Sequence, residues 1–334
     1  MILSLIIAYR EKRTIRMNTE KIQYNRITNI SSEESNPKDK ITDISTDEPI
    51  NGTRLKKAIL HLLTAALFFS LMTFFVRISG ELPTMQKTFF RNFFALIVAT
   101  GAIVKNKIGF SVRKGNGVSL LMRCLFGTSG MIANFWAIDR LGIADANMLN
   151  KLSPFFAIIV SYFIMKEIPT AIDWSCVAIA FIGSLFIIKP SVGLASIPAL
   201  VGLYGGFGAG AAYAFVHKMG KTGQPGKTIV FYFSLFSCLV TGPFLIFDWH
   251  PMTTAQWACL IGAGVSAGIA QFNITAAYQN APAKDISVFD YTQVIFAACL
   301  GMIFLNEFPD IYSLIGYVII IGAAVIKWQI ARKR

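Results

Sequence analysis

Residues 58–77 read AILHLLTAALFFSLMTFFVR, an apolar run in which Arg77 is the only side chain charged at neutral pH. A bilayer core about 30 Å thick is crossed by roughly 20 helical residues, so this run is long enough to span a membrane. Similar runs follow it with short intervals between them. They cover Thr88–Val104, Val118–Ile138, Ala146–Met165, Ile172–Ile188, Ala199–Val216, Thr228–Phe247, Gln256–Tyr278, Ile286–Leu305 and Ile311–Ile326. A soluble core buries one or two such segments but not ten in succession, so the sequence predicts an all-α polytopic membrane protein with ten transmembrane helices.

The N-terminal residues 1–57 differ from the rest in composition. They are rich in Lys, Glu, Asp, Ser, Asn and Thr, whereas the whole chain is 54% hydrophobic with a mean hydropathy of +0.56. A polar segment without apolar periodicity cannot bury enough surface to fold, so we expect a disordered cytoplasmic tail. Met17 is an alternative start of the natural chain.

A net charge of +13 would be consistent with nucleic-acid binding, but the basic residues are concentrated in the loops and ends that border the apolar segments. With both termini placed in the cytoplasm, the inner loops and ends hold most of the basic residues that border the segments. They are Arg54, Lys56, Lys57, Lys105, Lys107, Arg113, Lys114, Lys166, Lys218, Lys221, Lys227, Lys284, Lys327, Arg332, Lys333 and Arg334. The outer loops hold Lys87, Arg140 and Lys189, so the bias obeys the positive-inside rule. This predicts an integral protein of the cell (inner or plasma) membrane, with both termini cytoplasmic and no nucleic-acid partner.

The five cysteines lie in different apolar segments and the three histidines are far apart in the sequence. Neither set has the spacing of a disulfide framework or of metal ligands. We therefore expect no metal and no cofactor.

The chain repeats itself at an offset of about 140 residues. The clearest match sets Lys166-Glu-Ile-Pro169 against Asn306-Glu-Phe-Pro309, and the same offset aligns the segment boundaries of both halves. This predicts two five-helix repeats, 58–190 and 198–330. Because five crossings is an odd number, the second repeat enters the membrane from the opposite side. Such inverted repeats are typical of carriers that work by alternating access.

Ten segments in two repeats, each with a Glu-x-Pro turn followed by a Gly-bearing helix, resemble the drug/metabolite transporter superfamily, EamA type. The residues that carry the resemblance are Glu167, Pro169 and Gly183 in the first repeat, and Glu307, Pro309 and Gly322 in the second. The resemblance implies a transporter of amino acids, nucleosides or other metabolites. It also implies a central cavity lined by the third, fourth, eighth and ninth segments.

Ionisable side chains inside the bilayer are costly and mark functional sites. Lys151 follows Asn150 and precedes Pro154 in the fourth segment, and Asp290-Tyr-Thr-Gln293 opens the ninth. At the repeat offset, Asn150 is equivalent to Asp290, and Lys151 to Tyr291. We interpret Lys151, Asp290, Asn150, Tyr291 and Gln293 as substrate-binding residues; the alternative is an ion pair between Lys151 and Asp290 that holds the repeats together.

Further polar residues in the spans complete the candidate cavity. They are Arg91, Arg123, Asn134, Trp136, Gln271 and Asn273. The alternatives are snorkelling of both arginines to the interface and hydrogen bonds between helices for the uncharged residues. Gly202, Gly206 and Gly210 indicate a helix-packing surface. We expect Glu167 and Glu307 to cap the turns that follow them.

These features predict a secondary transporter, exchanger or facilitator that moves a small polar metabolite, such as an amino acid or a nucleoside-like compound. A Walker motif is absent from the sequence. Asp290 is the candidate proton carrier, with a proton or another ion as the coupling partner. The cationic excess of the candidate cavity favours a carboxylate-bearing or zwitterionic solute. A channel or structural membrane protein, or a lipid-modifying enzyme, is the alternative; a non-enzymatic monomer or homodimer is our prediction.

Overall fold

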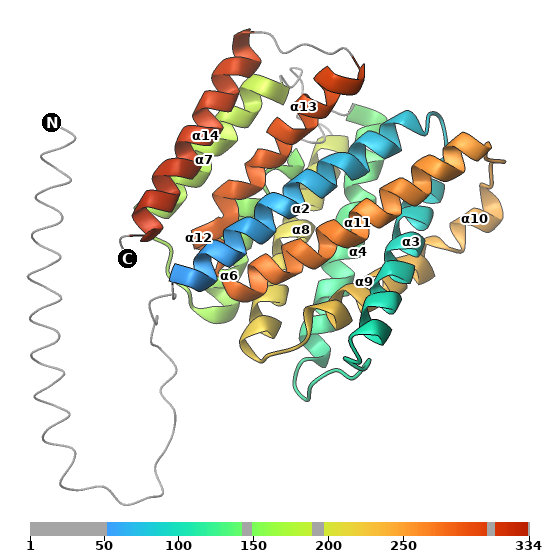
Figure 1. The fold of residues 1–334 in the computed structure, drawn as a ribbon, viewed down its shortest axis with the longest axis horizontal. Helices are drawn as coiled ribbons and strands as arrows, with labels where there is room; N and C mark the ends of the chain where they lie inside the picture. Colours follow the sequence, from blue (N-terminus) through green and yellow to red (C-terminus); the bar gives the residue numbers. More distant parts are fainter. Residues whose placement is uncertain (1–51, 142–148, 189–196, 306–310, 333–334) are drawn as a thin grey trace, which may run out of the picture. The chain divides into compact units, whose positions relative to one another are not determined.

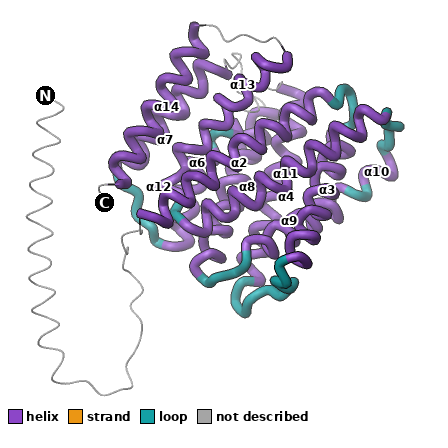
Figure 2. The backbone as a smooth tube through the Cα atoms, viewed as in Figure 1, coloured by secondary structure: helices purple, strands orange, loops and turns teal. Residues whose placement is uncertain are grey.

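The computed structural model describes residues 52–141, 149–188, 197–305 and 311–332, and over these residues it is helical without a strand (Figure 2). The helices are α2 (Gly52–Ile78), α3 (Thr84–Lys105), α4 (Gly117–Leu141), α6 (Ser153–Met165), α7 (Ala171–Ile188), α8 (Ile197–Lys221), α9 (Gly226–Thr241), α10 (Phe244–Phe247), α11 (Thr254–Asn280), α12 (Ala283–Ile286), the 3₁₀ helix η1 (Ser287–Tyr291), α13 (Thr292–Leu305) and α14 (Ile311–Arg332). Residues 52–57, which we expected in the disordered tail, begin α2 because Leu55 is buried in the core. Residues 1–51 of that tail lie outside the described residues.

Eight of the helical stretches are long and apolar enough to cross a membrane, and Ser153–Met165 and Ala171–Phe186 are shorter apolar helices. Together these account for the ten predicted segments. Large apolar side chains such as Leu239, Phe247 and Val318 are exposed on the outside of the bundle. An apolar outer surface of this kind suits a lipid environment.

Helix packing follows the predicted duplication. At an offset of 140 residues, α2 corresponds to α8, α3 to α9, α4 to α11, α6 to α13 and α7 to α14. The pairing of α4 with α8 recurs as that of α11 with α2, and the pairing of α6 with α8 recurs as that of α13 with α2 (Figure 1). When the two repeats are interchanged, the contacting pair α3–α9 maps onto itself, and so does the pair α7–α14. The two repeats are therefore related by an approximate two-fold axis, as inverted repeats require.

Two transmembrane segments are broken at equivalent places. In the first repeat a turn at Lys151 and Leu152 precedes α6, whose first turn contains Pro154. In the second repeat η1 separates α12 from α13. The predicted ninth segment, Ile286–Leu305, therefore starts with a 3₁₀ helix, and its regular α-helix begins at Thr292. Broken helices leave backbone groups that can bind ligands at membrane depth.

The glycines of α8 allow neighbouring helices to approach closely, which confirms the packing surface predicted from Gly202, Gly206 and Gly210. A Cβ atom at Gly210 would lie 2.6 Å from the Ser153 carbonyl oxygen and 2.7 Å from the Ala157 nitrogen. A Cβ at Gly206 would lie 2.6 Å from the Leu149 carbonyl oxygen. The broken fourth segment thus rests directly on the α8 backbone.

Four loops, 106–116, 166–170, 222–225 and 281–282, converge at one end of the bundle, which we call the basic end. Arg113 donates from its backbone nitrogen to Gln224 Oε1 (2.8 Å) and from its guanidinium to the Thr222 carbonyl (2.8 Å). Gln279 donates to the Gln224 carbonyl at 2.7 Å. At the opposite end, Gln86 exchanges two hydrogen bonds with the His250 backbone. Each end therefore joins the first repeat to the second.

Candidate functional site

The predicted pair Lys151 and Asp290 meets at the two helix breaks. Lys151 Nζ lies 3.5 Å from Asp290 Oδ2 and donates to Gln293 Oε1 at 2.7 Å. Both charged side chains are buried, with about 9% of each exposed. Lys151 comes from the first repeat and its two partners come from the second. This cluster is the core of the candidate site.

Two further hydrogen bonds hold the cluster in place. The Tyr291 hydroxyl donates to the Lys151 carbonyl at 2.8 Å, and Ser70 of α2 donates to the Gln293 carbonyl at 2.8 Å. Tyr291 is fully buried. Because both acceptors are backbone carbonyls beside the helix breaks, the breaks are held in position by neighbouring elements.

Arg91 of α3 and Arg123 of α4 are buried rather than snorkelled, with 5% and 2% of their surface exposed. The Arg91 guanidinium is directed at the sulfur atoms of Met72 (2.9 Å) and Met131 (2.7 Å). Arg123 donates to Gln271 Oε1 at 3.1 Å and lies over the Phe233 ring at 4.0 Å. The snorkelling alternative is therefore wrong for both residues.

Tyr213 of α8 packs against the buried core of the bundle. Its ring stacks on Tyr278 of α11, with centroids 4.7 Å apart. The sequence did not single out Tyr213 and Tyr278, nor the Met72 and Met131 sulfurs, because apolar and aromatic residues are common throughout the spans.

Other candidates lie elsewhere or make different contacts. Asn273 Oδ1 lies 2.7 Å from His61 Nδ1 of α2, and the Trp136 ring stacks under the Arg140 guanidinium at 3.8 Å. Asn134 packs against Gly205 of α8, and within the described parts of the chain its buried Oδ1 has no hydrogen-bond partner. The Asn150 backbone lies against Gly206. The structure thus brings together Lys151, Asp290, Tyr291 and Gln293. It also pairs Arg123 with Gln271, and it directs Arg91 at two methionine sulfurs.

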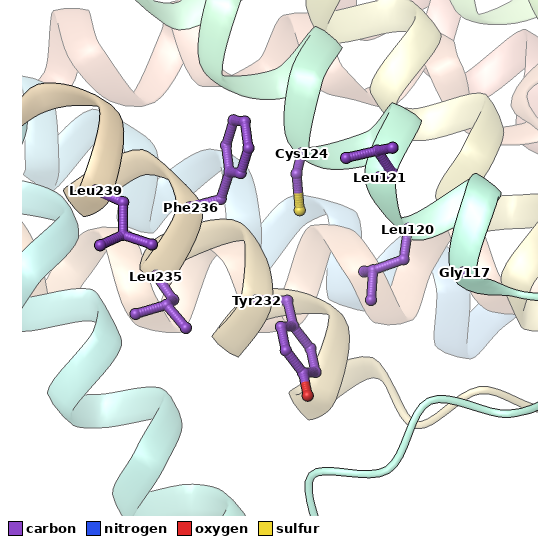
Figure 3. A pocket seen from close by; sticks show the side chains of 8 residues that line it. All are labelled: Gly117, Leu120, Leu121, Cys124, Tyr232, Leu235, Phe236 and Leu239. Carbon is purple, nitrogen blue, oxygen red and sulfur yellow. The ribbon is translucent and has the colours of Figure 1, made fainter.

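A pocket of about 280 Å³ lies between α4 and α9 (Figure 3). Its lining is Gly117, Leu120, Leu121, Cys124, Tyr232, Leu235, Phe236 and Leu239. None of the predicted site residues lines it, and Leu121 and Leu239 are exposed at the surface of the bundle. An apolar groove on the outer flank offers nothing to orient a polar solute, so the candidate site remains the polar cluster inside the bundle.

Glu167 links the first repeat to α8 at the basic end. Its Oε1 accepts from Lys221 Nζ at 2.8 Å and lies 2.9 Å from His217 Nε2. The expected role as a cap of its own turn is thereby corrected, because these partners lie on a distant helix. Burial alone would raise the pKa of the Glu167 carboxyl, but hydrogen bonds and charges from His217 and Lys221 outweigh burial and lower it below the ordinary value. Glu307 lies outside the described residues.

A second buried ionic cluster joins α7, α12 and α14. Lys327 contacts Asp173 directly, and its Nζ lies 3.7 Å from Asp285 Oδ1. Lys327 and Asp173 have at most 2% of their side chains exposed. In the part of the chain that the structure covers, three or more His, Cys, Asp or Glu side chains do not gather as metal ligands would.

The fold and the buried site together define a class: a helical membrane protein built from two inverted repeats around a polar centre. The model of the EamA-like transporter family matches residues 56–189 and 196–327. The chain belongs to this family of membrane transporters.

Individual relatives agree with that class. The pseudopaline exporter CntI of Pseudomonas aeruginosa (strain UCBPP-PA14) is 31% identical over 276 residues, covering 81% of this chain and 95% of the exporter. Human solute carrier family 35 member G1 is 24% identical, covering 82% of this chain and 80% of its own. A solved crystal structure with 17% identity has a TM-score of 0.72 and covers 82% of this chain and 98% of its own. At 17% sequence identity, this structural similarity is evidence for the fold alone.

Proposed function

We propose that this transporter is a secondary active carrier or exchanger that moves a small polar metabolite, such as an amino acid or a nucleoside-like compound, by alternating access. The observation that carries the proposal is the contact of Lys151 with Asp290 and Gln293 at the two equivalent helix breaks. Ionisable groups from both repeats meet there, so a solute bound at this place contacts both moving halves.

The proposed repeats are 58–190 and 198–330, with the substrate bound between them. Lys151, Asp290, Tyr291 and Gln293 form the proposed central binding residues, together with Arg91, Arg123 and Gln271. Asp290 is the proposed proton carrier. When its contact with the lysine breaks, a buried carboxylate can take up a proton, and it can release the proton when the contact forms again. Both termini are proposed to be cytoplasmic and the membrane to be the cell membrane. The name of the relative at 31% identity supports export as the direction.

Counterflow in liposomes tests the proposal. Purified protein is reconstituted, and the uptake of labelled amino acids and nucleosides is measured with and without the same unlabelled solute inside. A carrier shows faster uptake when the solute is present on the far side, whereas a channel does not. Lys151→Gln is expected to reduce this exchange more than tenfold, and Arg54→Gln, a change at an exposed cation of α2, is the matched control.

If unlabelled solute inside the liposomes does not accelerate the uptake of any of the solutes, the result favours the channel alternative. Exchange that is unaffected by Lys151→Gln would move the binding site away from the helix breaks.

A further inference from the structure

Arg91 is a buried cation whose acceptors are two thioether sulfurs. Its Nε and one terminal nitrogen point at Met72 and Met131, at 2.9 and 2.7 Å. A thioether is a weak acceptor and carries no charge. Among the described residues, no carboxylate forms a salt bridge with Arg91, so its charge is left without compensation in the interior of a membrane protein.

Arg123 is buried in a similar way. Its partners are the Gln271 side-chain oxygen at 3.1 Å and the face of Phe233 at 4.0 Å. Its buried Nε has no hydrogen-bond partner among the described residues. No carboxylate among the described residues forms a salt bridge with Arg123 either.

Both arginines are buried, on α3 and α4, two helices that contact each other. Burying one unpaired charge is expensive, and burying two charges of the same sign in one bundle costs more. A cost of this kind is retained where the missing counter-charge arrives with a ligand. Arginine also suits that task, because its planar guanidinium matches carboxylate and phosphate oxygens.

We infer that Arg91 and Arg123 bind an oxyanion of the substrate, a carboxylate or a phosphate, so the transported solute is acidic. This inference rests on the proposed carrier function and adds the class of solute. The contact of Lys151 with Asp290 and Gln293 is a second polar centre inside the bundle. A solute with an acidic group at one end and a polar group at the other would reach both places.

Met72 and Met131 act as replaceable partners in this arrangement. A methionine side chain is unbranched and flexible, so it can turn away from the guanidinium without breaking a strong hydrogen bond. An arriving oxyanion then replaces a weak neutral acceptor by a charged one. Binding is thus favoured for the acidic solute over its neutral analogue.

The test compares two matched pairs of solutes on the purified full-length protein at constant ionic strength. Glutarate and glutaramide differ only by carboxylates against amides, and adenosine monophosphate and adenosine differ by a phosphate. Thermal stabilisation is measured as a function of concentration. The acidic member of at least one pair is expected to act at a concentration at least tenfold lower than its neutral partner, and the pair that responds identifies carboxylate or phosphate.

Arg91→Gln and Arg123→Gln are expected to remove this preference, whereas Arg54→Gln keeps it. If the Gln variants do not fold, Arg91→Lys and Arg123→Lys keep the charge and lose the planar geometry, with about a tenfold loss expected. Equal effects of both members in both pairs, including no effect of any probe, would overturn the anion site. So would a preference that survives in both arginine variants.

Counterflow separates this inference from the carrier proposal. Arginine-dependent binding of an acidic probe without any exchange would leave the anion site standing and remove the carrier mechanism. Exchange of a neutral solute at the same rate in wild type and both arginine variants would support the carrier mechanism and remove the anion site.

Discussion

Tyr291 donates a hydrogen bond from its hydroxyl to the carbonyl oxygen of Lys151, at 2.8 Å, and these two residues are equivalent positions of the two repeats. A residue can contact its own equivalent only near the axis that relates the repeats. The contact therefore places the helix breaks, and the ionisable cluster around them, close to the approximate two-fold axis of the bundle. A site on that axis contacts both halves of the molecule, whichever half moves.

Asp290→Asn tests the proposed proton coupling. We expect accumulation driven by a pH gradient to fall at least tenfold, because an amide cannot release a proton, while counterflow exchange persists. Liposome uptake at several external pH values measures both. Asp248→Asn, a change at an exposed carboxylate, is the control. Unchanged accumulation with an unchanged pH dependence would remove Asp290 from this role.

Cysteines introduced at Lys105 and Lys227 test the inverted topology. Both positions are expected to react with an impermeant thiol reagent from the cytoplasmic side, because their loops meet where Thr228 contacts the Gly109 carbonyl. Glu81→Cys, at the opposite end, should react from outside in intact cells. The five native cysteines are buried or half-buried and give the background. Reaction of the Lys105 and Lys227 positions from opposite sides of the membrane contradicts inverted repeats.

Gly210→Ala tests the close packing of α8 against the fourth segment. The added Cβ would lie 2.6 and 2.7 Å from backbone atoms of Ser153 and Ala157, which cannot move away as a side chain can. We expect a destabilisation of about 1–3 kcal/mol, measured as a loss of thermal stability in detergent. Gly322→Ala of α14 is the matched control, since its Cβ meets nothing within 4 Å. That change should be neutral or stabilising by up to about 1 kcal/mol, because alanine favours helix. Equal effects at the two positions would mean that α8 has room to adjust.

Lys327→Met tests the ionic cluster of α7, α12 and α14. Removing the ammonium leaves Asp173 and Asp285 buried near each other, and losing one partner of a buried ion pair typically costs about 3–5 kcal/mol. We expect a marked fall in thermal stability and in the yield of folded protein. Adding Asp173→Asn to Lys327→Met should recover part of the loss, because it removes one of the two buried negative charges. A double variant less stable than Lys327→Met would contradict this account.

Glu167→Gln tests the link between the first repeat and α8. At neutral pH we expect a loss of about 1–3 kcal/mol, because the contacts with His217 and Lys221 lose their charge. The pKa of Glu167 is lower in the folded protein than in the unfolded chain. Unfolding therefore takes up a proton in acid, so this contribution is present above the ordinary carboxyl pKa and is lost as the pH falls through the folded value.

Melting temperatures between neutral pH and about pH 3 measure this effect. The wild type should lose stability toward acid more steeply than Glu167→Gln, and the two curves should approach each other at the acidic end. Parallel curves over the whole range would show that the partners of Glu167 do not stabilise its charged form in the folded protein.

The spans, the duplication and the pairing of Lys151 with Asp290 could be predicted from the residues themselves. A run of apolar residues has a length that either crosses a bilayer or does not, and that comparison needs no information about neighbours. Repeats at one offset imply equivalent positions, and two opposite charges at nearly equivalent positions are natural partners. The helix break at Lys151 also had a local signal in Pro154.

The other contacts between distant parts of the chain had no such signal. Nothing near Arg91 in the sequence indicates that Met131 would face it, and the pairs Asn273–His61 and Glu167–His217 join residues from separate helices. The 3₁₀ helix at Asp290 likewise depends on the helices packed around it. Hydrophobic length and repetition are properties of a segment alone, whereas the partner of a buried polar group depends on which helices approach each other and how each is rotated. The membrane architecture and the Lys151–Asp290 pair were therefore predictable from the sequence, whereas the partners of the other buried charges were decided by the packing of the helices.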